Sequence, residues 1–181
     1  MVWFVAAESS LAPEIRERVT AVKGLFLDVD GVLTDGRIVI DGSGNETKFF
    51  HVRDGLGIRK MMLAGIRVAL ITGRSSLAVA VRAKELGIEE VHQGVRDKEA
   101  VFELILDKWK IRPAEAAYVA DDIPDLPVFK RVGLAVAVND ASLDILESAH
   151  LVTKSKGGFG AVREVAELIL KEQGAWNNEA R

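Results

Sequence analysis

Short aliphatic runs alternate with longer amphipathic stretches along most of this 181-residue sequence. A strand followed repeatedly by a helix is typical of a parallel sheet that has helices on both faces. Hydrophobic residues make up 49% of the chain, which is enough to build the buried core that such a sheet requires. The sequence therefore predicts an α/β sandwich of three layers, formed by one domain over residues 1–181.

The hydrophobic pattern places the individual elements. Strands are expected at residues 25–29, 68–72, 90–92, 117–120 and 134–138. Helices are expected at residues 13–21, 54–64, 75–86, 98–109 and 161–171, with Asp54 as an N-cap and with Gly65 and Gly87 as stops. The polar end of the chain, residues 174–181, is expected to be a frayed tail.

One segment, residues 36–51, does not fit the strand–helix pattern and is predicted to form a β-hairpin around the turn at residues 41–44. Ile38 and Ile40 share one face of the first strand, and Phe49 and Phe50 must point to opposite faces of the second. A two-stranded ribbon with apolar side chains on both faces predicts burial against other subunits. The alternative is that one face packs on its own domain and the other stays exposed.

Composition excludes several classes of protein. A net charge of −3 argues against a broad nucleic-acid-binding surface. The absence of cysteine excludes disulfides and thiolate metal sites, and it is compatible with a reducing cytoplasm. Residues 1–7 are apolar but carry no Lys or Arg, so they do not resemble a signal peptide. We also expect no membrane span, because no apolar run is long enough.

Polar residues follow three of the predicted strands, where ligands bind in sheets of this kind. They are Asp28 and Asp30 after the first, Thr72, Gly73 and Arg74 after the second, and Asp121, Asp122 and Asp125 after a later one. Clustered carboxylates need a cation, and oxygen ligands suit Mg²⁺. Each segment alone has a simpler interpretation: Asp-x-Asp-Gly as a turn, Thr72 or Asp121-Asp122 as a helix cap, and Lys98 as a solvated lysine.

In combination these residues predict phosphoryl transfer. Asp28 can attack phosphorus to form an acyl phosphate, and Asp30 can protonate the leaving oxygen and later deprotonate water. Asp28, Asp121 and the backbone carbonyl of Asp30 are candidate ligands of Mg²⁺.

The four segments resemble the motifs of the haloacid dehalogenase superfamily: residues 27–34 (LDVDGVLT), 71–74 (ITGR), Lys98, and 121–125 (DDIPD). The resemblance implies a Rossmann-like fold, with Asp28 as nucleophile and metal ligand and Asp30 as acid/base. It further implies that Thr72 holds a phosphoryl oxygen with Gly73 and Arg74 beside it, and that Lys98 offsets charge on the nucleophile. Asp121 would ligate magnesium, while Asp122 and Asp125 would orient metal-bound waters or Lys98.

The hairpin, residues 52–58 (VRDGLGI) and residues 157–164 (GGFGAVRE) resemble the family of 3-deoxy-D-manno-octulosonate 8-phosphate phosphatases. This resemblance implies no cap domain, a homotetramer whose neighbouring subunits cover each active site, and a role in lipopolysaccharide precursor synthesis. The chain departs from the family at Phe159, at Ala120, and at residues 75–77. A phosphatase for a nine-carbon keto sugar acid phosphate or another small phosphate, and a catalytically idle binding module, are the alternatives.

Overall fold

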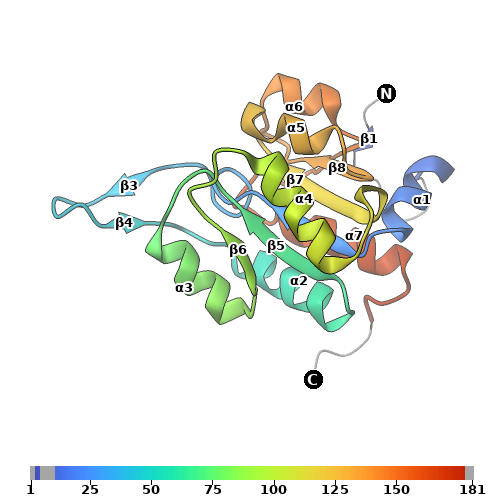
Figure 1. Ribbon diagram of the computed structural model, residues 1–181, viewed down its shortest axis with the longest axis horizontal. Helices are drawn as coiled ribbons and strands as arrows, with labels where there is room; N and C mark the ends of the chain where they lie inside the picture. The colour runs from blue at the N-terminus through green and yellow to red at the C-terminus, as the bar shows by residue number, and fades with distance from the viewer. Residues whose placement is uncertain (1–2, 5–10, 178–181) are drawn as a thin grey trace.

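A seven-stranded parallel sheet forms the centre of the molecule, with the strand order β1-β9-β8-β7-β2-β5-β6 (Figure 1). The computed structural model describes Trp3–Phe4 and residues 11–177. The strands are β1 (Trp3–Phe4), β2 (Gly24–Leu27), β5 (Arg67–Ile71), β6 (Glu90–His92), β7 (Ala116–Ala120), β8 (Leu134–Ala137) and β9 (Leu151–Val152). The central strands β2, β7 and β8 are buried throughout, as expected for a sheet covered on both faces.

Helices cover both faces of the sheet. They are α1 (Pro13–Thr20), α2 (Val52–Leu63), α3 (Leu77–Leu86), α4 (Lys98–Trp109), α5 (Leu126–Phe129), α6 (Leu143–Ser148) and α7 (Ala161–Glu172), with short 3₁₀ turns η1 (Pro113–Glu115) and η2 (Ile123–Asp125). Figure 1 shows α4 in front of the sheet and α7 behind it, where α7 packs against α1 and α2. The ring of Phe102 on α4 meets the ring of Phe26 on β2 edge-on, with 4.8 Å between centroids. Within the described residues, no helix is both long and apolar enough to cross a bilayer.

The predicted fold class is confirmed, and most predicted elements lie within one or two residues of those observed. β6 and α4 have the predicted bounds. The left-handed Gly87 ends α3 as predicted. The short helices α5 and α6 were not predicted, because neither spans two full turns of hydrophobic pattern.

The prediction that Asp54 caps its own helix is wrong. The N-cap of α2 is His51, whose Nδ1 accepts a hydrogen bond from the backbone N–H of Arg53 at 3.3 Å. Asp54 is buried in the first turn of α2, and its Oδ1 accepts from the backbone N–H of Arg163 at 2.7 Å. Asp54 therefore satisfies a free donor in the first turn of α7 and joins two helices that are distant in sequence.

The structure describes residues 174–177 of the predicted tail. Trp176 is half-buried against the core, and its carbonyl accepts a hydrogen bond from Lys60 Nζ at 2.9 Å. The ring lies 4.6 Å from the guanidinium carbon of Arg163 and 4.7 Å from Lys60 Nζ, which is within the range of cation–π attraction. The rest of the predicted tail, residues 178–181, lies outside the described residues.

The hairpin protrudes from the domain (Figure 1). Its paired strands, β3 (Val39–Ile40) and β4 (Glu46–Thr47), are antiparallel and span only part of the predicted hairpin segment 36–51. Phe50 packs against the core, whereas 63% of the surface of Phe49 is exposed. Neighbouring residues of this strand thus point to opposite faces, as its pattern predicts. Between β2 and α2 the described chain has this hairpin in place of a cap domain.

We expect Asp54→Ala to lower the free energy of unfolding by about 1 kcal/mol, because it removes the side-chain acceptor at the start of α7. Chemical denaturation would measure the loss. Asp144→Ala, which removes an exposed carboxylate from the first turn of α6, is the matched control and should have a clearly smaller effect. Equal stability of the two variants would contradict this role for Asp54.

Candidate active site

Three neighbouring strands carry the predicted site. β2 is paired with β5 on one side and with β7 on the other, and all three run in the same direction. Their carboxyl ends therefore meet at one edge of the sheet, where Asp28 follows β2, Thr72 follows β5 and Asp121 follows β7. The structure brings together residues that are up to 93 positions apart in the sequence.

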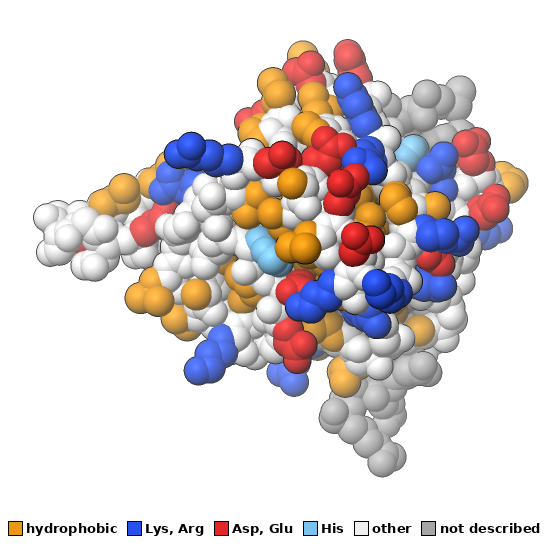
Figure 2. Space-filling view, in the orientation of Figure 1, with side chains coloured by type: hydrophobic (Ala, Val, Ile, Leu, Met, Phe, Trp, Pro, Cys, Tyr) orange, Lys and Arg blue, Asp and Glu red, His pale blue; other side chains and the backbone are white. Residues whose placement is uncertain are grey.

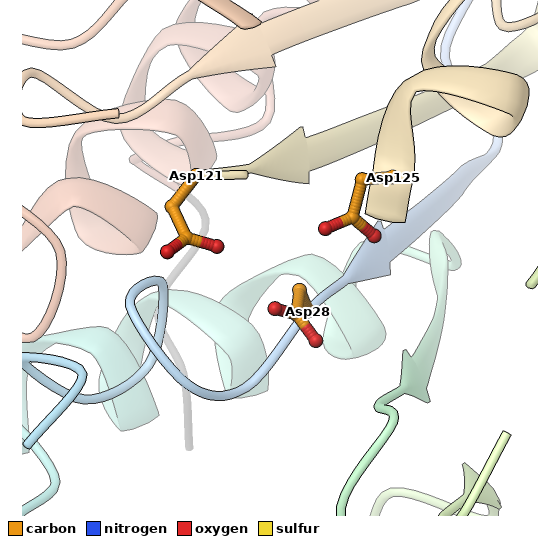
Figure 3. A group of neighbouring side chains, drawn as sticks. All are labelled: Asp28, Asp121 and Asp125. Atoms are coloured by element: carbon orange, nitrogen blue, oxygen red, sulfur yellow. The ribbon is translucent and has the colours of Figure 1, made fainter. Parts of the chain in front are cut away.

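Three carboxylates converge at this edge. Asp28, Asp121 and Asp125 each offer an oxygen, and these oxygens lie within 4.8 Å of one another (Figure 3). Burial, and then repulsion from Asp125, raise the pKa of Asp28 to about 6, against the opposing effect of Lys98. Burial, and then repulsion from Asp28 and Asp125, raise the pKa of Asp121 to about 8. The cluster therefore holds more negative charge than its surroundings balance.

Lys98 supplies the cation that the cluster does contain. It is the first residue of α4, and its ammonium lies 3.0 Å from Asp28 Oδ1 and 2.7 Å from Asp125 Oδ1. Burial lowers the pKa of this ammonium, but the two carboxylates outweigh that effect and the net pKa is raised. Lys98 therefore stays charged beside the predicted nucleophile.

Tyr118 is a member of the site that the sequence reasoning missed. Its hydroxyl, fully buried on β7, donates to Asp125 Oδ1 at 2.6 Å. Burial and the neighbouring Asp125 raise the pKa of this hydroxyl well above its usual value, so Tyr118 remains a donor. Two donors thus fix the carboxylate of Asp125, and this carboxylate in turn positions Lys98. An apolar strand pattern gives no sign that one of its aromatic residues faces a carboxylate.

The predicted acid/base, Asp30, belongs to a ring of four alternating charges. Lys48 Nζ contacts Asp30 Oδ1 and lies 3.4 Å from Glu46 Oε1. Arg74 Nη2 binds the same Glu46 oxygen at 2.8 Å, and Arg74 Nε lies 3.7 Å from Asp30 Oδ2. Glu46 and Lys48 come from the hairpin, and the sequence reasoning assigned neither to the site.

Close backbone packing shapes the floor of the site. Gly31 has a φ of +86°, and a Cβ on it would lie 1.9 Å from Asp121 Oδ2. A Cβ on Gly157 would lie 1.6 Å from the carbonyl oxygen of Gly31. Asp140 Oδ1 accepts from the backbone N–H of Gly157 at 3.0 Å and holds this second loop in place. Only glycine lets the loops after β2 and β9 approach the acidic cluster this closely.

The remaining predicted residues divide between the site and its rim. Thr72 is buried at the end of β5, and its hydroxyl accepts from the backbone N–H of Arg74 at 3.5 Å across Gly73. Asp122 is exposed, and its carboxylate accepts from the backbone N–H of Ile123 as the cap of η2. The simpler cap interpretation thus applies to Asp122, and its part in orienting metal waters stays a prediction.

Comparison with known proteins identifies the class of this site. The haloacid dehalogenase-like hydrolase family matches residues 57–133. A 3-deoxy-D-manno-octulosonate 8-phosphate phosphatase of Yersinia pestis is 45% identical over 163 residues, which cover 90% of this chain and 87% of that protein. The chain therefore belongs to the 3-deoxy-D-manno-octulosonate 8-phosphate phosphatase family of the haloacid dehalogenase-like hydrolases.

Solved structures agree with this assignment. A crystal structure of the Yersinia pestis phosphatase superposes with a TM-score of 0.91 at 43% identity, covering 93% of this chain and 91% of that one. The phosphatase of Moraxella catarrhalis, solved in complex with magnesium, phosphate and KDO, superposes with a TM-score of 0.90 at 41% identity. That match covers 92% of this chain and 96% of the other.

The acidic cluster fits a magnesium ion. Its donors are carboxylate oxygens, the ligands that Mg²⁺ prefers. Moreover, the raised pKa values of Asp28 and Asp121 mark a site where negative charge lacks a balancing cation.

We expect the affinity for Mg²⁺ to weaken as the pH falls from above 8 to 6. Asp121, whose pKa is about 8, gains its proton first, and Asp28, whose pKa is about 6, gains its proton next. Mg²⁺ must displace these protons, so the affinity should fall by about tenfold per pH unit for each proton displaced. Calorimetric titration in buffers of different ionisation enthalpy would measure both the affinity for Mg²⁺ and the number of protons displaced. An affinity that is constant between pH 6 and 9 would contradict the expectation.

Proposed function

We propose that this protein is a magnesium-dependent phosphomonoesterase that hydrolyses 3-deoxy-D-manno-octulosonate 8-phosphate to the free sugar acid and phosphate. The observation that carries the proposal is Lys98 bridging Asp28 and Asp125 beside Asp121, at the strand ends of a chain that belongs to this phosphatase family. A carboxylate that faces both a fixed ammonium and a cation site is suited to attack an anionic phosphate. The product is a precursor for lipopolysaccharide synthesis, and we place the reaction in the cytoplasm.

The chemistry divides between Asp28 and Asp30. Asp28 attacks phosphorus, and the bond from phosphorus to the leaving sugar oxygen breaks while Asp30 gives that oxygen a proton. Asp30 then takes a proton from water as the water attacks the phosphorus of the aspartyl phosphate. Phosphate leaves, and the Asp28 carboxylate is restored.

Other groups bind the phosphoryl group and offset its charge. The hydroxyl of Thr72 and the backbone at Gly73 hold phosphoryl oxygens, and Lys98 offsets charge on the nucleophile and the phosphoryl group. Asp28, Asp121 and the carbonyl of Asp30 would hold Mg²⁺, which supplies Lewis-acid stabilisation of the phosphoryl charge. Asp125 stays outside this ligand set, because its Oδ1 already accepts from Lys98 and Tyr118.

One observation favours a related substrate as the second candidate. Phe159 is 58% exposed on the loop whose Gly157 packs against Gly31, so it lies at the rim of the site. An aromatic ring at this point offers a substrate no charge. The lack of charge at this position favours a substrate selectivity different from that of the family, for example for a nine-carbon keto sugar acid phosphate. We propose Arg74 and the loop of residues 154–156, with Lys154 and Lys156, as contacts for the substrate carboxylate, because all three basic side chains can reach solvent.

A panel of phosphorylated substrates tests the proposed function. We expect Mg²⁺-dependent turnover of eight- and nine-carbon keto sugar acid phosphates to exceed that of neutral hexose phosphates. Asp28→Asn should abolish turnover, because an amide cannot attack phosphorus, and Asp30→Asn should lower kcat by ~10²–10⁴-fold. Circular dichroism would check that both variants are folded. Full activity of Asp28→Asn, or a preference for neutral hexose phosphates, would contradict the proposal.

We also propose that the protein is a homotetramer in which neighbouring subunits cover each active site. The exposed fractions on the hairpin are 54% for Ile38, 59% for Ile40 and 63% for Phe49, and α3 adds Leu77 at 80% and Val81 at 60%. β4 lies next to α3, so these side chains belong to neighbouring elements. Figure 2 shows hydrophobic side chains on the hairpin and below it on α3. Closed symmetry would bury all copies of this surface equivalently.

The double variant Ile40→Asp, Phe49→Asp tests this assembly. We expect the wild type to sediment well above the monomer mass and the variant to be smaller, because charges replace the buried contacts. The variant should lose more activity on the sugar acid phosphate than on an aryl phosphate, which needs fewer contacts. A monomeric wild type with full activity on the sugar acid phosphate would exclude the proposal.

A further inference from the structure

The ammonium of Lys48 is buried at an unusual place. Only 1% of its side chain is exposed, although Lys48 follows a strand of the protruding hairpin. A lysine is rarely buried this far unless carboxylates compensate for the lost hydration. Here the compensating groups are Asp30 and Glu46.

The direction of the strand explains how Lys48 reaches the site. Side chains alternate along β4 and the residues that follow it, so Glu46, Lys48 and Phe50 share one face. The side chains of Glu46 and Lys48 are 14% and 1% exposed, whereas Thr47 and Phe49 on the opposite face are exposed. The inward face therefore presents one ammonium to the predicted acid/base.

We infer that Lys48 is a positioning residue for Asp30, an assignment that rests on the proposed function. Asp30 must aim a carboxyl oxygen first at the leaving group and then at the attacking water. Of its two ion-pair partners among the described residues, Arg74 is 45% exposed and 3.7 Å away, so solvent screens it. Lys48 is screened far less and fixes the orientation of the carboxylate.

A purely structural role, in which Lys48 only anchors the hairpin, leaves its placement unexplained. Phe50 already packs against the core, and β4 lies against α3. Two other contacts therefore hold the base of the hairpin. Furthermore, Arg74 and Glu46 form an ion pair of their own at 2.8 Å, which joins the hairpin to the end of β5 without Lys48.

The two chemical steps distinguish positioning from anchoring. An aryl phosphate with a good leaving group, such as 4-nitrophenyl phosphate, does not need a proton from Asp30 when phosphorus is transferred to Asp28. The hydrolysis of the aspartyl phosphate does need Asp30, to accept a proton from water. A sugar acid phosphate, whose leaving group is an alkoxide, needs Asp30 in both steps.

We therefore compare Lys48→Met with the wild type by rapid-quench kinetics on both substrates, using the full chain and saturating Mg²⁺. The rate of the first release of 4-nitrophenolate should change by less than about threefold. Steady-state turnover should fall by ~10–10²-fold, which is less than the ~10²–10⁴-fold contribution of general acid–base catalysis because Asp30 is still present. Acid-trapped phosphoenzyme should accumulate. On the sugar acid phosphate the first turnover should slow as well, and Lys48→Arg should recover most of the loss in both assays.

Lys23→Met is the matched control, because it removes a lysine that pairs with Glu115 at 2.6 Å beside the opposite end of β2. It should leave both steps unchanged. Equal slowing of both steps on 4-nitrophenyl phosphate by Lys48→Met, a raised KM with unchanged kcat, or wild-type kinetics would overturn the inference. If Lys48→Met does not fold, Lys48→Gln replaces it as the variant that removes the charge, and the same results on the two substrates support or overturn the inference. Failure of the wild type to form a phosphoenzyme would instead refute the proposed function.

Discussion

The contact of Lys98 with Asp28 and Asp125 is the interaction on which the rest of this site depends. It joins the end of β2, the start of α4 and the turn η2, and all three groups are buried. Without Lys98, the two buried carboxylates would lose their compensating charge, so the three segments must keep their relative positions. Among the residues that the structure describes, Asp121 has no such partner, and this imbalance is what makes the edge of the sheet a cation site.

Backbone packing sets how closely the remaining parts approach this charge cluster. A side chain on Gly31 would collide with Asp121, and a side chain on Gly157 would collide with the backbone of Gly31. The two loops can therefore lie against each other only as glycine segments, and Asp140 holds the outer one in place. The outer loop also carries Phe159, whose side chain is exposed two residues beyond Gly157.

The sequence predicts the sheet, its main helices and the convergence of Asp28, Thr72 and Asp121, because hydrophobic period and strand-end position are local properties of the chain. It does not predict Tyr118 or Lys48, since their partners lie in other segments and their own surroundings look like an ordinary strand and an ordinary hairpin. The prediction for Asp54 fails for the same reason. Its position suits an N-cap of its own helix, but in the fold its carboxylate accepts a hydrogen bond from the first turn of α7. A local pattern shows that a polar group needs a partner, and only the fold decides which one.

The hairpin combines two tasks through the alternation of its side chains. Glu46 and Lys48 face inward toward Asp30, while Phe49 between Lys48 and Phe50 faces outward. A slip of one residue in this strand would turn Lys48 to solvent and bury Phe49 against the charges of the site, so the register is strongly constrained. The same register links the outward surface at Phe49 to the position of Lys48 beside Asp30. A partner that packs against Phe49 would fix the strand on which Lys48 lies, and assembly would thereby help to orient Asp30.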